Sequence, residues 1–323
     1  MEHILILHHD DRDGYTSAAL IVDYLEKKYK KEEISIYTRE IDYSVLLIDV
    51  FEDCVNQMGR HPDHIYILDY SISTIDNCSA ILKLARTHDL VWIDHHKSTI
   101  EMAEEYPSIE FIEGYRVDGI AGCALTYLWT HDIKPYVDIE KGNENIVSFL
   151  KQCGCPPYVL YAHRYDIFDV DEDVLCFNYG NLISSVREAL SYIHMSEEEL
   201  NKYIIEEGKI IKGYLDKQNR ILVESNAIEH TCTFENRELK YLILNHTVFN
   251  SLIFGDLINE YDFVCIYALQ KNGKWKHSLY TVKDDIDVSR IAKKFDGGGH
   301  RKAAGFVSGA PLILQFQLIS RNL

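Results

Sequence analysis

Three clusters of carboxylates and imidazoles each follow a short apolar run of this sequence. The clusters are His9 with Asp11 and Asp13 after residues 4–7, Asp69 after residues 64–68, and Asp94-His95-His96 after residues 90–93. Mixed imidazole and carboxylate ligands suit Mn²⁺ and similar divalent ions. Two such ions held close together can activate a water and stabilise the oxygens of an in-line displacement at phosphorus. The clusters therefore predict a binuclear metal site for phosphoester chemistry.

The runs that precede the clusters are typical of buried strands in a parallel sheet, because they are continuous and rich in Ile, Leu and Val. We expect strands at 4–7, 34–41, 64–68 and 90–93, alternating with helices at 16–31, 45–58 and 74–87. This rhythm predicts a doubly wound α/β fold, with a further strand expected at 109–112. Ligand sites in such sheets lie beyond the carboxyl ends of the strands, so one edge should gather all three clusters.

The rest of the chain predicts a helical region followed by a smaller α+β domain. Helices are expected at 119–131, 143–152, 158–168 and 195–223, the last opened by a capping box of Ser196 and Glu199. Strands are expected at 227–234, 239–244, 262–269 and 275–282, with helices at 249–261 and 288–295. An Asn272-Gly273 turn joins the last two strands. We therefore expect a catalytic domain at 1–194, a helical connector at 195–225 and a substrate-binding domain at 226–323.

The composition narrows the class of substrate and the compartment. The net charge of −18 over 323 residues disfavours long nucleic acid, which needs many phosphate neutralisations, and favours a small phosphorylated substrate. We expect no membrane span, since no stretch approaches about 18 apolar residues. The eight cysteines form no CxxC pair, and the N-terminus lacks the pattern of a secretory signal. These features predict a cytoplasmic protein with free thiols.

Two aspartates invite more specific roles within the metal site. Asp69, which comes from a strand of its own, could bridge two ions through its two oxygens. Asp94 is better placed to hold an imidazole in its ligating tautomer. The sequence contains no GxxxxGK[ST] phosphate loop, GxSxG elbow or GxGxxG fingerprint.

The order of the motifs HHDDRDG, LDYS, DHHKS and GGGHRKAAG resembles the DHH phosphoesterase family with its associated C-terminal domain. The resemblance covers nearly the whole chain. It implies two metals, commonly manganese, with His9 and Asp11 on one, Asp13 and His95 on the other, and Asp69 between them. It also implies that His96 contacts or orients the substrate phosphate.

The family's fourth motif supplies one more aspartate to the metals. Asp166 matches in order and follows a helical segment, while Asp169 is a competitor and Asp118 a more remote one. The neighbouring Arg164 suits either a substrate phosphate or a structural ion pair.

The C-terminal motif Gly297-Gly298-Gly299-His300-Arg301 has two interpretations. Successive glycines let backbone amides approach an anion, although a glycine run after a helix is also an ordinary turn. Beside a phosphoesterase domain, we expect the motif to clamp the end of a nucleotide. The family often has an arginine within a Ser-Leu-Arg-Ser strand, where this chain has Tyr280. Tyr280 is equally suited to stack on a base or to pack internally.

These features together predict a manganese-dependent phosphodiesterase that cleaves short oligoribonucleotides to mononucleotides. The alternatives are cleavage of cyclic or linear dinucleotides, removal of the 3′-phosphate from a bisphosphorylated adenosine nucleotide, and a catalytically silent nucleotide-binding regulator. The expected partners are the short substrate and, as one candidate assembly, a second copy of the chain in a homodimer.

Overall fold

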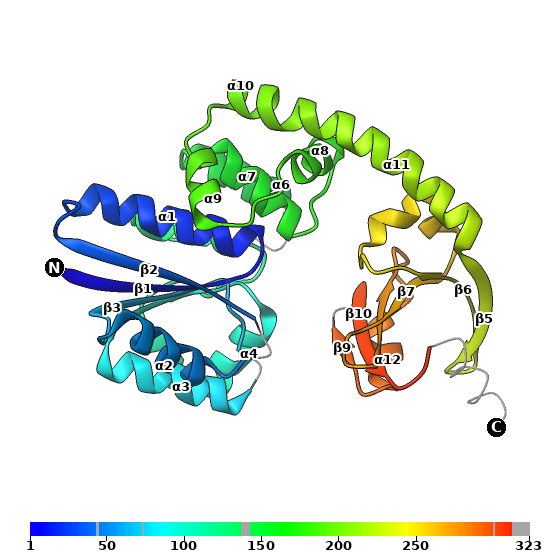
Figure 1. The fold of residues 1–323 in the computed structure, drawn as a ribbon, viewed down its shortest axis with the longest axis horizontal. Coiled ribbons are helices and arrows are strands. Elements are labelled where there is room, and N and C mark those ends of the chain that lie inside the picture. The colour runs from blue at the N-terminus through cyan, green and yellow to red at the C-terminus, as the bar shows by residue number, and fades with distance from the viewer. Residues whose placement is uncertain (43–44, 73, 137–142, 300, 312–323) are drawn as a thin grey trace. The chain divides into compact units, whose positions relative to one another are not determined.

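The computed structural model describes residues 1–42, 45–72, 74–136, 143–299 and 301–311 (Figure 1). The chain divides into two compact units, Met1–Ile211 and Lys212–Leu323. The boundary lies within helix α11 (Glu206–Asn226), inside the segment 195–225 that the sequence predicts as a connector.

A four-stranded parallel sheet forms the centre of the first unit. Its strands are β1 (Glu2–His9), β2 (Ile34–Ile41), β3 (His64–Leu68) and β4 (Asp89–Ile93), in the spatial order β2-β1-β3-β4. Every neighbouring pair is parallel, so all four carboxyl ends lie at one edge. The doubly wound α/β class predicted from the sequence is confirmed.

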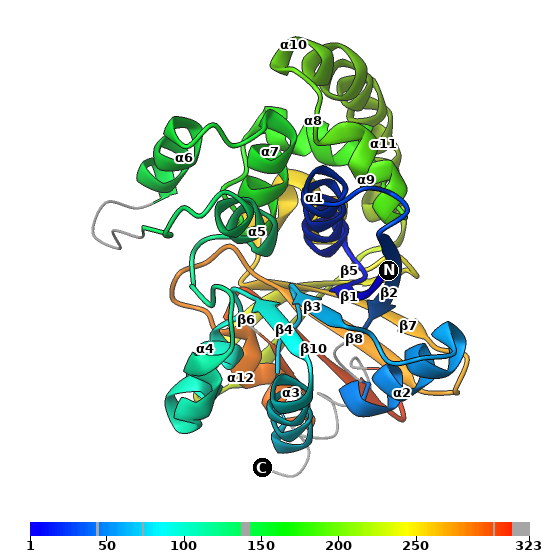
Figure 2. The same cartoon turned by 90° about the vertical axis from the view of Figure 1, so that its left-hand side faces the viewer.

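Helices cover both faces of this sheet (Figure 2). α1 (Arg12–Lys28) and α5 (Gly122–Thr130) lie on one face, and α2 (Leu47–Met58) and α3 (Ile75–Thr87) lie on the other. Two separate buried cores result, because alternate residues of β1 point to opposite faces: Ile4 and Ile6 join one core, and Leu5 and Leu7 join the other.

The remaining helices of the first unit follow β4 along the chain. They are α4 (Lys97–Glu105), the 3₁₀ helix η1 (Pro107–Phe111), α6 (Asn143–Gln152), α7 (Pro157–Asp166), α8 (Glu172–Gly180), α9 (Val186–Tyr192), α10 (Glu197–Leu200) and the π-helical segment η2 (Asn201–Ile205). α10, η2 and α11 follow one another without a break, and the predicted capping box of Ser196 and Glu199 opens α10.

The strand predicted at 109–112 is wrong, since the chain forms η1 there. Pro107 opens this 3₁₀ helix, and the buried Ile109 and Ile112 are three residues apart, which places them on the same side of such a helix. After η1, Glu113 makes an isolated parallel bridge to Val91 of β4, and Arg116 makes one to Asp94 just beyond β4.

The second unit contains a six-stranded mixed sheet in the order β5-β6-β7-β8-β10-β9. The strands are β5 (Ile228–Phe234), β6 (Arg237–Asn245), β7 (Phe263–Leu269), β8 (Trp275–Tyr280), β9 (Gly298–Gly299) and β10 (Ala303–Ser308). α12 (Val288–Lys293) belongs to the core on one face, and the 3₁₀ helix η3 (Ser251–Glu260) to the core on the other. The predicted α+β architecture is therefore confirmed.

The α-helix predicted at 249–261 is wrong in type. The chain forms η3 instead, with a break at Gly255, whose φ of 50° and ψ of −137° no helix accommodates. The eight cysteines are free and buried or half-buried. Among the residues that the structure describes, no helix combines the length and apolar character needed to cross a membrane.

Candidate metal centre

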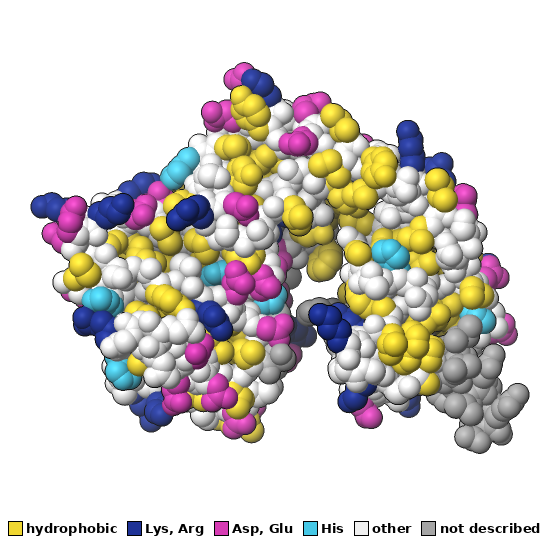
Figure 3. Space-filling view, viewed as in Figure 1, with side chains coloured by type: hydrophobic (Ala, Val, Ile, Leu, Met, Phe, Trp, Pro, Cys, Tyr) yellow, Lys and Arg dark blue, Asp and Glu magenta, His cyan; other side chains and the backbone are white. Residues whose placement is uncertain are grey.

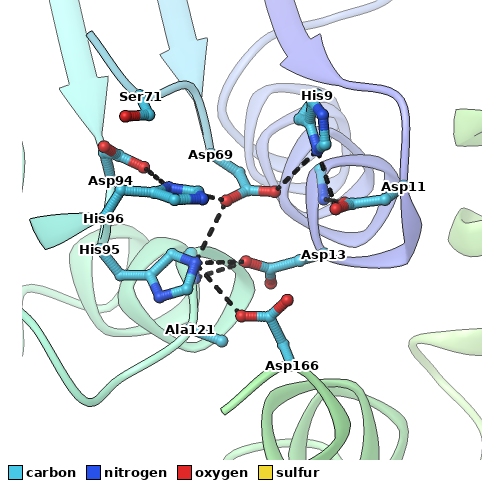
Figure 4. Close-up of polar contacts among 12 residues, drawn as sticks. His9, Asp11, Asp13, Asp69, Ser71, Asp94, His95, His96, Ala121 and Asp166 are labelled. Atoms are coloured by element: carbon cyan, nitrogen blue, oxygen red, sulfur yellow. Dashed lines mark hydrogen bonds and ion pairs between the residues drawn. The ribbon is translucent and has the colours of Figure 1, made fainter. Parts of the chain in front are cut away.

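Side chains from the three sequence clusters and from α7 meet at the carboxyl edge of the parallel sheet (Figure 4). Three sets each bring their ligand atoms within 4.8 Å of one another: His9–Asp11–Asp69, Asp13–His95–Asp166 and Asp69–His95–His96. The first set contains Asp69, and the second adjoins it through His95, whose Nε2 atom lies 3.4 Å from Oδ1 of Asp69. Such a pair of adjoining sets is what two neighbouring cations require.

The first set is built where β1 passes into α1. The Nδ1 atom of His9 lies 2.8 Å from Oδ2 of Asp11 and 3.9 Å from Oδ2 of Asp69. Asp11 is also the N-cap of α1, because its Oδ1 accepts a hydrogen bond from the Gly14 amide at 2.9 Å. Burial by itself would raise the pKa of Asp11, but the His9 hydrogen bond and the Gly14 amide lower it to about 2.

The tight turn before α1 depends on Gly14. A Cβ atom at this position would lie 2.2 Å from the carbonyl oxygen of His9, so any side chain would push α1 away from the end of β1. Gly14 therefore fixes the spacing between His9 and Asp11.

The second set surrounds the imidazole of His95. Its Nε2 atom lies 3.2 Å from Oδ2 of Asp166, 3.4 Å from Oδ1 of Asp69 and 3.7 Å from Oδ2 of Asp13. One imidazole nitrogen carries at most one proton, which cannot satisfy three carboxylates. The geometry therefore calls for further positive charge.

Asp13 is held in place by backbone amides rather than by another side chain. Its Oδ2 accepts a hydrogen bond from the Gly122 amide and its Oδ1 from the Cys123 amide, both at 2.7 Å. These donors belong to the first turn of α5, where helix amides have no partners within the helix. A fixed orientation of Asp13 follows.

Asp69 has the most unusual environment in the site. It is buried, and its φ of 52° lies in the left-handed region that few residues other than glycine adopt. Among the described residues, no hydrogen-bond donor reaches either carboxylate oxygen. Burial, with Asp13 and Asp11 nearby, raises the pKa of Asp69 well above its ordinary value.

Asp166 repeats this pattern at the end of α7. Its Oδ2 has no hydrogen-bond donor within the described part of the chain, and burial together with Asp13 raises its pKa. Buried carboxylate oxygens without donors are costly unless a cation takes the place of the donors. The donor set of three aspartates around an imidazole fits a divalent ion, and Asp69 is positioned to serve two.

Asp94 and His96 form a separate hydrogen-bonded pair beside Asp69. The Nδ1 atom of His96 lies 2.8 Å from Oδ1 of the fully buried Asp94 and 3.8 Å from Oδ1 of Asp69. Burial opposes charge on His96, but the Asp94 hydrogen bond and the surrounding carboxylates raise its pKa. The same hydrogen bond lowers the pKa of Asp94 despite its burial. This pair can present a protonated imidazole to an anion.

Arg12, which lies between two of the predicted ligands, was not singled out from the sequence. Its guanidinium donates hydrogen bonds to the side chain and the carbonyl oxygen of Asn178 and to the carbonyl oxygen of Asn181. It also lies over the rings of Tyr165 and Phe177, at 5.4 and 5.2 Å from their centroids. Arg12 thus ties the start of α1 to the region that carries Asp166.

His163 makes a second connection of this kind. Its Nδ1 accepts a hydrogen bond from the Ala121 amide at 3.2 Å, and burial lowers its pKa to about 3. The neutral imidazole joins α7 to the start of α5, whose next two amides hold Asp13. The only sequence signal for this role is a histidine one helical turn before Asp166.

The other candidates for the fourth aspartate lie in different surroundings. Asp169 accepts a hydrogen bond from Nε of Arg164 at 2.8 Å, and Asp171 accepts one from the same guanidinium. Arg164 thus makes a structural ion pair. Asp118 is exposed in a turn.

The predicted substrate-binding residues belong to the second unit. Gly298 and Gly299 form β9, and a Cβ at Gly297 or Gly299 would lie closer than 3 Å to β10. The hydroxyl of Tyr280 donates to the carbonyl oxygen of Phe249 at 3.1 Å, and Arg301 donates to the carbonyl oxygen of Asp284. His300 lies outside the described residues.

We compared the chain with models of known protein families. Residues 3–153 match the model described as "DHH family, N-terminal domain". The first unit therefore contains a DHH family N-terminal domain. The matched DHH domain contains the sheet and every predicted metal-site residue except Asp166.

One relative of known sequence and two solved structures are similar to this chain. The chain is 31% identical over 99 residues to oligoribonuclease NrnB of Bacillus subtilis (strain 168), a match that covers 31% of this chain and only 23% of the relative. A solved DHH domain described as a member of the s1p family of ribosomal proteins has a TM-score of 0.59 at 15% identity, covering 95% of this chain and 82% of that one. An exopolyphosphatase-related protein from Bacteroides fragilis has a TM-score of 0.55 at 14% identity, covering 99% and 91%. These two structures share the fold of this chain.

Proposed function

We propose that this DHH protein is a metal-dependent phosphodiesterase that hydrolyses short oligoribonucleotides to mononucleotides. The observation that carries the proposal is the position of Asp69, a buried carboxylate without donors that adjoins one ligand set on each side. Neighbouring cations on the two sets would suit hydrolysis at phosphorus.

The residues that would hold the two ions follow from the sets. His9, Asp11 and Asp69 would hold one ion, and Asp13, His95, Asp166 and Asp69 the other. Nitrogen and oxygen ligands together favour Mn²⁺ over the all-oxygen surroundings typical of Mg²⁺. When bound, two such ions would lower the pKa of a coordinated water and polarise the phosphoryl oxygens.

The chain's own residues would orient the substrate and stabilise charge. His96, with its Nδ1 hydrogen-bonded to Asp94, would donate from its other ring nitrogen to a phosphoryl oxygen of the substrate. The hydrogen bond to Asp94 would hold this imidazole in its orientation and favour its protonated form. Backbone amides fix Asp11 and Asp13, whose carboxylates accept hydrogen bonds from them.

The preference for short oligoribonucleotides rests on two supports. The relative named oligoribonuclease aligns with part of this chain at 31% identity. The net charge of −18 disfavours a long polyanion, which would need an extended basic surface. We further propose that the glycine motif at 297–299, with His300 and Arg301, holds the end of the substrate, and that Tyr280 contributes by packing.

A substrate panel tests the proposal. The full chain with Mn²⁺ should release mononucleotides from di- to pentanucleotides of RNA faster than it cleaves cyclic dinucleotides or removes the 3′-phosphate of a bisphosphorylated adenosine nucleotide. The matched control is Asp69→Asn, which should lose turnover while remaining folded. Nucleotide binding without metal-dependent turnover would instead assign the chain as a regulator and overturn the proposal.

A further inference from the structure

An exposed apolar stripe runs along one side of α11 and of the π-helical segment η2 that precedes it. Its members are Tyr203, Ile210, Tyr214 and Ile221. Ile210 is 75% exposed and Tyr214 63%, which is high for large hydrophobic side chains. Spacings of seven and four residues keep such side chains on one side of a helix, and Figure 3 shows hydrophobic side chains on the surface along α11.

Residues on the other side of α11 make the packing contacts of this helix within each unit. At about 100° per residue, Gly208 and Val223 lie on the opposite side of the helix. A Cβ at Gly208 would lie 1.8 Å from the carbonyl oxygen of Cys176, so α11 meets α8 there at close range. Val223 is buried in a core of the second unit. The packing contacts made by Gly208 and Val223 therefore do not involve the stripe.

Two exposed charges of opposite sign interrupt the stripe. Glu207 lies before Ile210, and Lys217 lies after Tyr214, on the same side of the helix. The other charged pairs of this helix join Lys209 to Glu206 and Lys212 to Asp216.

The stripe can pair with a second copy of itself that runs in the opposite direction, with position 212 of each helix at the centre. Ile210 and Tyr214 are equally far from this position, and so are Glu207 and Lys217, and Tyr203 and Ile221. In an antiparallel pair, each apolar residue of one helix would meet an apolar residue of the other. Each Glu207 would meet Lys217 of the second copy, and this contact would occur twice.

We infer that α11 is the interface of a homodimer in which two copies of the helix pack antiparallel. A two-fold axis makes every contact reciprocal, as this pattern requires. Opposite charges at the flanks of an apolar seam set the orientation of paired helices, and they matter more in a chain whose net charge of −18 opposes self-association. Gly213 borders the seam with nothing within 4 Å of where its Cβ would lie, so it leaves room for a second helix to approach closely.

Charge reversal in the full chain tests both the interface and its orientation. Sedimentation equilibrium should show a dimer for the wild type. Glu207→Lys and Lys217→Glu should each weaken it about tenfold or more, because two like-charge contacts replace two attractive ones. The double variant Glu207→Lys/Lys217→Glu should restore the dimer, and a mixture of the two single variants should form a heterodimer. Arg220→Glu, off the stripe, serves as the control.

Each outcome decides the matter. Restoration by the double variant supports the antiparallel helix pair, since the swap changes no net charge. A chain that remains monomeric over the accessible concentration range overturns the inference. So does a dimer that all of these variants leave unchanged, because it would use another surface. The test is independent of catalysis, so it stands whatever the substrate proves to be.

Discussion

Replacing Gly122 by alanine tests how closely Asp13 and Asp69, one from each ligand set, pack around this position. A Cβ atom at this position would lie 2.9 Å from Oδ2 of Asp13 and 3.0 Å from Cβ of Asp69. Asp13 cannot turn aside without losing the hydrogen bonds from the Gly122 and Cys123 amides. The overlap of roughly half an ångström relative to ordinary contact must therefore separate the two carboxylates or displace α5.

The expected cost falls mainly on metal binding. Disturbing groups that orient metal ligands lowers affinity by about 10- to 100-fold, and we expect a change of that size for Mn²⁺. Overpacking costs about 1–3 kcal/mol of stability, partly offset by about 1 kcal/mol gained when alanine replaces glycine in a helix. We therefore expect the variant to unfold at a moderately lower temperature while still folding.

Calorimetric titration with Mn²⁺ and thermal unfolding of the same preparation measure the two effects. Gly309→Ala is the matched control, because nothing lies within 4 Å of the position where its Cβ would be. A Gly122→Ala variant that binds Mn²⁺ with unchanged affinity would refute the close construction of the site around Asp13 and Asp69.

Three further predictions concern other parts of the structure. Asp166→Asn should lower Mn²⁺ affinity and turnover by about 10- to 100-fold, whereas Asp169→Asn should leave both nearly unchanged, and equal effects would count against the assignment of Asp166. Arg12→Lys should lower the free energy of unfolding by about 2 kcal/mol in denaturant titrations, because lysine cannot reproduce the guanidinium's several hydrogen bonds, and an unaltered midpoint would show that Arg12 connects nothing. Burial lowers the pKa of His277 to about 4, below its ordinary value of 6.5, so the unfolded chain takes up this proton first as the pH falls. Stability should be full above pH 6.5 and decline toward pH 4, by about 3 kcal/mol in all, and His277→Phe should remove this part of the pH dependence.

The gathering of His9, Asp69 and His95 at one edge of the sheet could be predicted, because it depends on short sequence patterns. Each apolar run is a buried strand, and His9, Asp69 and His95 lie at or just beyond the ends of three neighbouring parallel strands. The order of parallel strands along the chain and their common direction are enough to bring these side chains together.

The supports of the site were not predictable, because they come from distant parts of the chain. Asp13 accepts from amides 109 and 110 residues away, and Arg12 donates to a side chain 166 residues away. No local periodicity records such contacts. The choice between Asp166 and Asp169 also needed the structure, since only the end of α7 decides which of them faces His95.

The local geometry of irregular segments escaped prediction for a different reason. Ile109 and Ile112 are apolar and close in sequence, as in a short strand, but their spacing of three fits the 3₁₀ helix that Pro107 opens. Short apolar runs do not distinguish the two, and the neighbouring proline decided the outcome.

The most direct test of the central claim is the number of Mn²⁺ ions that the full chain binds and whether they interact. Electron paramagnetic resonance during a Mn²⁺ titration measures both at once. We predict two ions per chain with the spectrum of a coupled pair in the wild type, and loss of the coupling in Asp69→Asn, which removes the carboxylate shared by the two sets. A wild-type chain that binds a single ion, or two ions without coupling, would contradict a binuclear centre built on Asp69.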